Sequence, residues 1–468
     1  MSQCSRSAPD ADTSVATSAP IQLQKYVSEN GFLSLDLEAK PQQVQLGDIS
    51  ANLLAYNGTV PGPLLEARPG DRVQIRFTNQ LTQPTNLHYH GLHIPIGGTG
   101  DDPFLAISPG ESHTYEYQIP DGHPAGTFWY HPHKHGLVAE QLFGGLAGLF
   151  VIRGELDEIP QIKAANEEFL VLKDFALDRS GNIADTGHMA AMTGRAGGLL
   201  TASGQINPAM PLQKGGLLRL RLLNASPSRF YRLSLEGHAM HLIATDGGAI
   251  ASPVELSDVV LAPGERAEVL VQGNQDPGNY RLINQPFNPA QGGMMGGMMS
   301  GNRNSDRSET VATLVYEGET EEMPLPSELI AVEPLPEPST TRQFTLNHGM
   351  GGGGMMGGGM VFMINGKSFD PARIDTQVML DTVEDWKITN TGSMTHPFHI
   401  HTNKFQIVDQ NGRPASYAAW KDVVSVSPGE TVRIRIAFRN YTGKTVYHCH
   451  VLDHEDRGMM GVLEIQQV

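Results

Sequence analysis

Short runs in which apolar and polar residues alternate dominate the chain. Examples are 44–58 (VQLGDISANLLAYNG), 72–79 (RVQIRFTN), 113–120 (HTYEYQIP) and 148–154 (GLFVIRG). Alternation with a period of two places one set of side chains on one face of a strand. Turn residues separate the runs at the spacing of a β-sandwich, and long helical periodicity is scarce. The pattern predicts an all-β protein.

One unit recurs along the chain: a Pro-Gly turn, an acidic residue and then an alternating strand. It occurs at 60–78 (VPGPLLEARPGDRVQIRFT), 259–271 (VVLAPGERAEVLV) and 424–438 (VSVSPGETVRIRIAF), with a related stretch at 211–222 (PLQKGGLLRLRL). Such turns lead the chain into strands. One sandwich architecture used three times is therefore predicted. The expected division is a disordered tail at 1–20, sandwich domains at 21–155, 156–318 and 343–468, and a Pro- and Glu-rich linker at 319–342.

Composition narrows the classes of partner. Hydrophobic residues make up 39% of the 468 residues, and no apolar run reaches the roughly 18–20 residues that a membrane span needs. Lys and Arg number 33 against 50 Asp and Glu, which gives a net charge of −17. A nucleic acid or an anionic membrane demands a basic surface. The sequence thus predicts a globular protein without a nucleic acid partner or a membrane span.

The chain has two cysteines, Cys4 and Cys449, too few for a disulfide framework. Cys4 lies in the polar tail, and whether it is lipidated stays open. No apolar segment of a secretory signal precedes residue 20, so the protein is either intracellular or has lost a signal. Cys449 is expected to be a free thiol or a metal ligand.

Ten of the eighteen histidines fall in four clusters. These are His88-Tyr-His90, His131-Pro-His133, His396-Pro-Phe-His399-Ile-His401, and His448-Cys449-His450 with His454. In a strand, residues two apart point to one face, with origins about 6.6 Å apart. The pairs 88/90, 131/133, 399/401 and 448/450 therefore offer eight imidazoles, which suit three copper ions with open positions for oxygen. The pair His133/His135 stays open as an alternative to the pair His131/His133.

Cys449 lies between His448 and His450, so in an extended chain its thiol points to the opposite face. It is therefore expected to serve a different metal ion from its two neighbours. The peptide bonds on either side of Cys449 give a short covalent path between that ion and the three-ion cluster.

The other residues around the thiol complete a recognisable ligand set. Thiolate, two imidazoles and a weak axial methionine are the ligands of a blue-copper electron-transfer site. The spacing of Cys449, His454 and Met459 fits one loop between two strands, and His396 would supply the second imidazole. Met460 stays open as the axial ligand.

These motifs resemble the signatures of the multicopper oxidases, the family of laccases and bacterial copper-efflux oxidases. The resemblance runs from NGTVPGPLLEARPGD through HYHGLHIP and GTFWYHPHKHG to HPFHIH and YHCHVLDHEDRGMMGVLEI, nearly the whole chain. It implies three cupredoxin-like Greek-key β-sandwich domains and four coppers per chain. The trinuclear cluster would lie between domains 1 and 3, and the type 1 copper in domain 3.

The resemblance also implies a role for each ligand. The type 2 copper would be bound by His88 and His399, the type 3 pair by His90, His131, His133, His401, His448 and His450, and the type 1 copper by His396, Cys449, His454 and Met459. Asp101, in TGDDPF, and Glu455 resemble the family's acidic groups near the cluster, which could relay protons. Asp102 competes with Asp101 for that role.

Two methionine-rich tracts, at 294–299 and 350–363, resemble segments of copper-efflux oxidases. Thioethers are soft ligands that select Cu(I). Met394, Met355, Met356 and Met360 are therefore candidate ligands for Cu(I) as a substrate. Gly392 stands where some relatives carry an acidic partner, and a glycine loop that only shields the type 1 site is the alternative.

The expected function is laccase-like: one-electron oxidation of phenols, aromatic amines or metal ions coupled to reduction of O2 to water. The alternative is a dedicated cuprous oxidase for copper tolerance. A copper-storage protein is a further class, and a copper nitrite reductase is disfavoured because it needs neither the 448/450 pair nor three domains. We expect a monomer. By analogy with relatives, we expect it to be periplasmic or otherwise exported.

Overall fold

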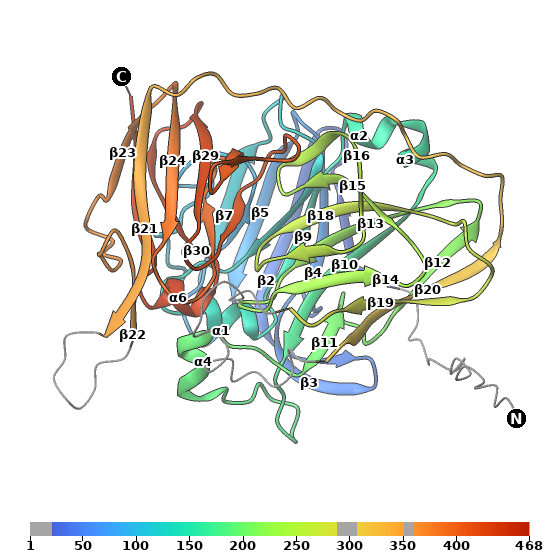
Figure 1. The fold of residues 1–468 in the computed structure, drawn as a ribbon. Helices are drawn as coiled ribbons and strands as arrows, with labels where there is room; N and C mark the ends of the chain where they lie inside the picture. Colours follow the sequence, from blue (N-terminus) through green and yellow to red (C-terminus); the bar gives the residue numbers. More distant parts are fainter. Residues whose placement is uncertain (1–20, 288–306, 351–359, 468) are drawn as a thin grey trace, which may run out of the picture.

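The computed structural model describes residues 21–287, 307–350 and 360–467. The candidates Cys4, Met355 and Met356 lie outside the described residues. Three consecutive stretches of the chain each form two β-sheets (Figure 1). The prediction of an all-β fold made of three sandwiches is confirmed.

The first sandwich combines sheets of order β1-β4-β9-β8-β6 and β3-β2-β5-β7. In β5 the side chains of Val73, Ile75 and Phe77 enter the core while Arg72 and Arg76 are exposed, as the period-two pattern predicts. The strands are β1 (Lys25–Val27), β2 (Phe32–Leu46), β3 (Ile49–Tyr56), β4 (Gly62–Ala67), β5 (Arg72–Asn79), β6 (His88–His90), β7 (Ser112–Gln118), β8 (Gly126–His131) and β9 (Gly148–Ile152).

The second sandwich combines sheets of order β11-β10-β13-β18-β15-β16 and β12-β20-β19-β14-β17. Its strands are β10 (Asn166–Phe175), β11 (Leu199–Ala202), β12 (Ala209–Lys214), β13 (Leu217–Asn224), β14 (Tyr231–Leu235), β15 (Met240–Thr245), β16 (Gly248–Leu256), β17 (Val259–Leu261), β18 (Arg266–Gln272), β19 (Asn279–Asn284) and β20 (Glu309–Glu319). Strand β13 is buried along its whole length, because it lies in the middle of its sheet and against the first sandwich.

The third sandwich combines sheets of order β22-β21-β24-β29-β26-β27 and β23-β31-β30-β25-β28. Trp386, Phe398 and Tyr447 pack together in its core. The strands are β21 (Thr340–Met350), β22 (Met360–Ile364), β23 (Thr376–Met379), β24 (Thr382–Asn390), β25 (His396–Ile400), β26 (Phe405–Gln410), β27 (Arg413–Pro414), β28 (Val423–Val426), β29 (Thr431–Phe438), β30 (Gly443–Cys449) and β31 (Met460–Gln466).

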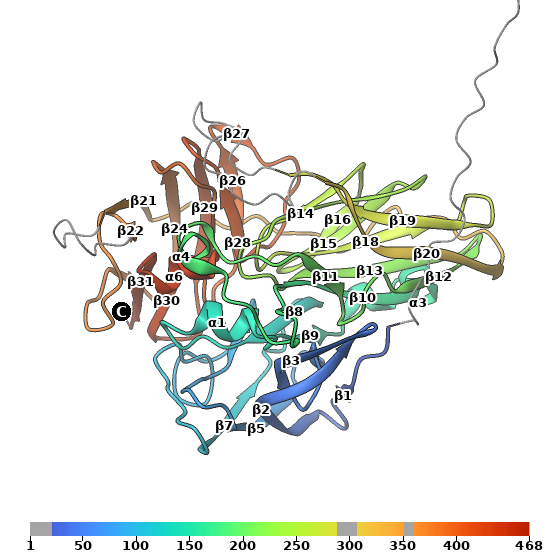
Figure 2. The same ribbon diagram turned by 90° about the horizontal axis from the view of Figure 1, so that it is seen from below.

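Within the described part of the chain the helices are short. They are α1 (Val138–Phe143), α2 (Glu155–Glu158), α3 (Pro160–Ala164), α4 (Gly187–Thr193) and α6 (Leu452–Asp456). Both α1 and α4 contact α6, so one helix from each sandwich region meets at a single place (Figure 2). Of the helices described, none is long and apolar enough to cross a membrane.

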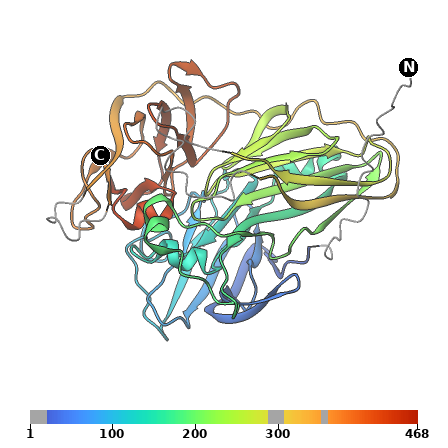
Figure 3. The same ribbon diagram turned by 60° about the horizontal axis from the view of Figure 1, so that its bottom comes forward.

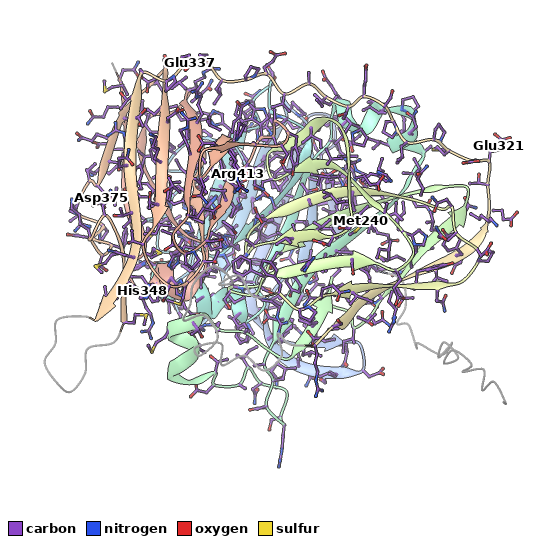
Figure 4. All side chains as sticks on the ribbon, in the orientation of Figure 1. Met240, Glu321, Glu337, His348, Asp375 and Arg413 are labelled. Atoms are coloured by element: carbon purple, nitrogen blue, oxygen red, sulfur yellow. The ribbon has the colours of Figure 1, made fainter. Side chains whose placement is uncertain are left out.

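The first sandwich touches both of the others (Figure 3). Residues 320–339 join the second sandwich to the third without a helix or strand, and Glu321 and Glu337 mark the two ends of this segment in Figure 4. The segment is nevertheless fixed to the surface, because Leu335 N–H donates to Gln406 Oε1 at 3.0 Å and Leu329 N–H to the Ala251 carbonyl at 2.9 Å.

Candidate metal centre

Four strands bring the histidine pairs together. Strand β6 pairs with β8 in the first sandwich, where His88 is opposite His131, and β25 pairs with β30 in the third, where His399 is opposite His448. The two strand pairs meet across the boundary between these sandwiches. Side chains more than 300 positions apart in the sequence therefore come within contact distance, as for His88 and His399, whose Nε2 atoms are 3.4 Å apart.

Gly91, which follows the His88-Tyr-His90 strand, permits this close approach. Its φ is +87°, a left-handed conformation that favours glycine. A Cβ atom there would clash with the Asp422 carboxylate and the Arg266 guanidinium. The glycine in HYHG thus lets the third and second sandwiches reach His90.

The eight imidazoles form three groups. His88 and His399 face each other through Nε2. The Nε2 atoms of His133, His401 and His448 lie 3.1–3.2 Å from one another. The rings of His90, His131 and His450 lie together with centroids 5.0–5.9 Å apart. The alternative His135 instead lies against Phe369, with ring centroids 4.6 Å apart.

The positions of the ring protons on His88 and His399 show what their facing Nε2 atoms can bind. His88 Nδ1 donates to Asp101 Oδ1 at 2.7 Å, and His399 Nδ1 donates to the Asp422 carbonyl at 2.8 Å. A neutral imidazole with a proton on Nδ1 has only a lone pair on Nε2. The two facing Nε2 atoms are therefore both acceptors and cannot bond to each other, whereas a cation between them would satisfy both.

The same argument holds for His401 and His448. His401 Nδ1 donates to Asp101 Oδ2 at 2.9 Å, and His448 Nδ1 lies 3.1 Å from both the Cys449 carbonyl and Glu455 Oε2. Their Nε2 lone pairs face each other at 3.1 Å. The Nε2 atoms of His90, His131 and His450 are buried, and none of them has a hydrogen-bond partner among the residues that the structure describes. Buried, convergent lone pairs of this kind fit copper, for which imidazole is a good ligand.

Burial keeps these rings neutral. Desolvation is the largest cause that lowers the pKa of His88, His90, His131, His133, His399, His401 and His450 well below the ordinary value. Neighbouring histidines lower the pKa of each further, because two protonated rings would repel. Neutral imidazole is the form that binds a metal ion.

A second group lies on the other face of β30. Cys449 Sγ is 3.4 Å from His396 Nδ1 and 3.8 Å from His454 Nδ1, and the two Nδ1 atoms are 3.3 Å apart. All three side chains are buried. Burial lowers the pKa of His396 to about 3 and raises the pKa of the Cys449 thiol. The thiol needs a cation beside it to ionise, and a bound metal ion supplies that cation.

The candidate methionines lie as follows. Met459 is fully buried in the same core cluster as Cys449, and its backbone carbonyl accepts from Cys449 N–H at 3.0 Å. Met460 instead pairs with His448 across β30 and β31. Met394 and Met360 are partly buried against the core cluster that holds Cys449.

Two acidic side chains approach the imidazoles. Asp101, buried, binds His88 with one oxygen and His401 with the other. Glu455, also buried, lies 3.4 Å from His133 Nε2 and 3.1 Å from His448 Nδ1. The Asp102 carboxylate instead accepts the Phe104 N–H at 2.9 Å. The structure therefore places Asp101 and Glu455, and not Asp102, beside the metal-binding groups.

Sequence reasoning missed Asp422 and Arg266. Asp422 Oδ1 lies 3.1 Å from His90 Nδ1, and the buried Arg266 guanidinium of the second sandwich holds the Asp422 carboxylate with two hydrogen bonds. The sequence spacing between these two residues and the histidines matches no known ligand motif. No signal in the chain pointed to them, because they reach the site only through the packing of all three sandwiches.

Comparison with known proteins agrees with this geometry. Three family models, each described as multicopper oxidase, match residues 38–157, 166–319 and 336–467. A multicopper oxidase of Staphylococcus aureus is 30% identical over 95% of this chain and 91% of its own length. The chain belongs to the multicopper oxidases. It is a copper-binding oxidoreductase that uses O2, and the predicted cupredoxin-like fold is confirmed.

Relatives in the family carry different names. A solved multicopper oxidase from Campylobacter jejuni, titled a metallo-oxidase, superposes with a TM-score of 0.86 at 30% identity, covering 97% of this chain and 96% of that one. The cell division protein FtsP of Proteus mirabilis is 28% identical over 90% of this chain and 86% of its own length.

Proposed function

We propose that this multicopper oxidase holds four coppers and oxidises phenols, aromatic amines or metal ions such as Cu(I) and Mn(II), one electron at a time. The observation that carries the proposal is the set of facing Nε2 lone pairs, His88 with His399 and His401 with His448, beside the Cys449 group. When bound, copper supplies one-electron redox chemistry between the reductant and O2.

The ligand roles follow the three groups. His88 and His399 would hold the type 2 copper. His396, Cys449 and His454 would hold the type 1 copper, and Met459 would be the further ligand because it is buried in the same core cluster as Cys449. The type 3 pair would be held by His133, His401 and His448 on one side and by His90, His131 and His450 on the other.

The protein's own groups manage protons and orientation. Asp101 orients His88 and His401 through their Nδ1 protons, which fixes the Nε2 lone pairs toward the metal sites. Glu455 Oε2 lies 3.1 Å from His448 Nδ1, so its carboxylate is placed to accept or return a proton beside the cluster. Cys449 joins the two centres covalently, since its neighbours in the chain are His448 and His450.

The remaining expectations form part of the same proposal. The chain would divide into domains at 21–155, 156–318 and 343–468, with the trinuclear cluster between the first and third. It would act as a monomer, exported to the periplasm or beyond. A dedicated cuprous oxidase is the second candidate, supported by Met394 and Met360, which are partly buried against the core cluster that also holds Cys449.

A spectrum and a rate measured together test the proposal. Copper-loaded protein should show an intense band near the orange-red and a type 1 EPR signal, and it should consume O2 with a phenol or a diamine. In Cys449→Ser the band should vanish and O2 uptake should stop, because the thiolate ligand is lost. If the wild-type protein binds copper but shows neither the band nor O2 uptake, the proposed oxidase activity is wrong and a copper-storage role is supported instead.

A further inference from the structure

Helix α6 carries two residues of the metal centre, His454 and Glu455, within five positions. A helix this short gains little stability from its own backbone hydrogen bonds. Its position must therefore be set by the surfaces on which it rests. Any shift of α6 moves the His454 ring directly.

The orientation of the His454 ring depends on this support. Metal-binding histidines usually fix their ring through a hydrogen bond from the second nitrogen, as His88 and His401 do on Asp101. Among the described residues no side chain does this for His454 Nε2, and its polar neighbour there is the Met192 backbone of α4. Phe362 stacks on the face of the His454 ring, at 4.0 Å between ring centroids.

The second sandwich region supports α6 from one side through Arg195. The Arg195 guanidinium donates two hydrogen bonds to the Asp453 carboxylate, from Nη2 to Oδ1 at 2.8 Å and from Nε to Oδ2 at 3.2 Å. The backbone N–H of Arg195 also donates to Asp453 Oδ2, at 2.8 Å. The Asp453 side chain is only 3% exposed. Pro227 accepts the Leu452 N–H at 3.0 Å, and Ser228 Oγ donates to the Arg195 carbonyl.

The first sandwich supports α6 from the other side. Asp456 accepts the backbone N–H groups of Gly136 at 2.6 Å and Ala139 at 2.9 Å, at the start of α1. Figure 2 shows α6 between α4 and α1. The helix that carries His454 is thus seated between segments of the two other sandwich regions.

We propose that Arg195 is a positioning residue for the copper site of Cys449, through its ion pair with Asp453 next to His454. The second sandwich, which supplies none of the proposed ligands, would in this way set the geometry of that site. The inference rests on the proposed function in one respect only, that His454 binds copper. It does not involve the cluster or the choice of reductant.

Three variants test this. Arg195→Met removes the ion pair, Arg195→Lys keeps the charge but loses the two-pronged contact, and Arg281→Met is the matched control. Arg281 forms an equally two-pronged pair with Glu236 in the second sandwich, but that pair is exposed and far from α6 in the fold.

Competition with a Cu(II) chelator, followed through the thiolate–copper band, gives the main readout. Loss of a group that orients a ligand typically lowers metal affinity or activity by roughly 10–100-fold. We expect that loss, with a shifted band and a changed reduction potential, in Arg195→Met, an intermediate effect in Arg195→Lys and none in Arg281→Met. An Arg195→Met protein with lower thermal stability but unchanged band, affinity and potential would overturn the inference.

Hydrogen exchange of the copper-free protein is the second readout. The amides of residues 452–456 should exchange faster in Arg195→Met than in wild type, while those of β30 stay protected. Unchanged exchange in α6 would also overturn the inference. This measurement needs no copper, so it separates a failure of the positioning role from a failure of the proposed function, which would appear as a missing band in wild type.

Discussion

A single carboxylate, Asp101, orients imidazoles from two different sandwiches. It reaches His88 of β6 and His401, which directly follows β25, with one oxygen each. Each imidazole donates its Nδ1 proton to this carboxylate. The other ring nitrogen, Nε2, therefore has a free lone pair that points toward the other imidazoles. At the scale of the residue, the position of the proton on each ring decides what the site can bind. The hydrogen bond of Nδ1 is therefore as important as the lone pair of Nε2.

Glu455→Gln should slow O2 consumption and leave the blue colour unchanged. The amide keeps a similar shape beside His448 but cannot exchange a proton, and loss of a positioned acid or base typically costs on the order of 10²-fold in rate. Steady-state O2 uptake and the visible spectrum measure the two effects. Glu464→Gln, on the neighbouring strand β31, is the control. Equal turnover in Glu455→Gln would rule out the proton-relay role.

His123 gives the copper-free protein a pH-dependent stability. Burial lowers its pKa from 6.5 to about 3, so below pH 6.5 the unfolded chain binds a proton that the folded chain does not. Stability is therefore lost as the pH falls from 6.5 toward 3. Between pH 7 and pH 5 this histidine alone should cost about 2 kcal/mol.

The variant His123→Gln tests that slope. Its side chain does not titrate but can still accept from the His93 N–H, which His123 Nε2 accepts at 3.2 Å. Denaturation of copper-free protein at pH 7 and pH 5 should show the variant losing about 2 kcal/mol less than wild type. An identical loss in both proteins would contradict the assignment.

At the scale of the element, strand β30 serves two sites with opposite faces. His448 and His450 point toward the imidazole groups of the first sandwich, and Cys449 points into the core of the third. This follows from the two-residue period of a strand. The short helix α6 follows β30 and places His454 next to the Cys449 thiol. Strand β30 and helix α6 together therefore supply two of the three side chains of the Cys449 group.

Deletion of the methionine-rich tracts distinguishes the two candidate functions. Removing 291–302 and 351–359 keeps β21 and β22, which end at Met350 and begin at Met360. We expect phenol oxidation to persist, because the Cys449 group and the facing histidines are untouched. O2 uptake with a phenol and with Cu(I) is the measurement. Selective loss of Cu(I) oxidation would support the dedicated cuprous oxidase instead.

At the scale of the whole molecule, a buried ion cluster joins the first and second sandwiches. The guanidinium of Arg221 binds Glu268, Glu167 and Asp157 and also donates to Thr127 Oγ1 of β8 at 2.9 Å. Strand β8 carries His131 at its end. The contact that fixes the relative position of the two sandwiches therefore also fixes one wall of the metal centre.

Arg221→Met should destabilise the protein strongly. Removing one partner from a buried ion pair costs about 3–5 kcal/mol, because the other charges stay buried without their partner. Arg232→Met breaks an exposed pair with Asp258 in the same sandwich and should cost no more than about 1 kcal/mol. Urea denaturation of both variants measures the difference. Equal, small losses would mean that the cluster contributes nothing to stability.

The sequence determined the strands and the kinds of ligand. Alternation of side chains is a local property of the chain, so β5, β13 and β29 could be predicted from their own residues. The opposite directions of Cys449 and its neighbours also followed from local geometry. The three-sandwich fold and the copper chemistry could therefore be stated before any contact was known.

Only the tertiary structure decided which nitrogens face each other. It chose His133 over His135 and Asp101 over Asp102 as neighbours of the other imidazoles, and it added Asp422, Arg266 and Arg195. These contacts join residues that lie far apart in the sequence. Their distances depend on how three sandwiches pack together, and spacing along a chain carries no information about that packing.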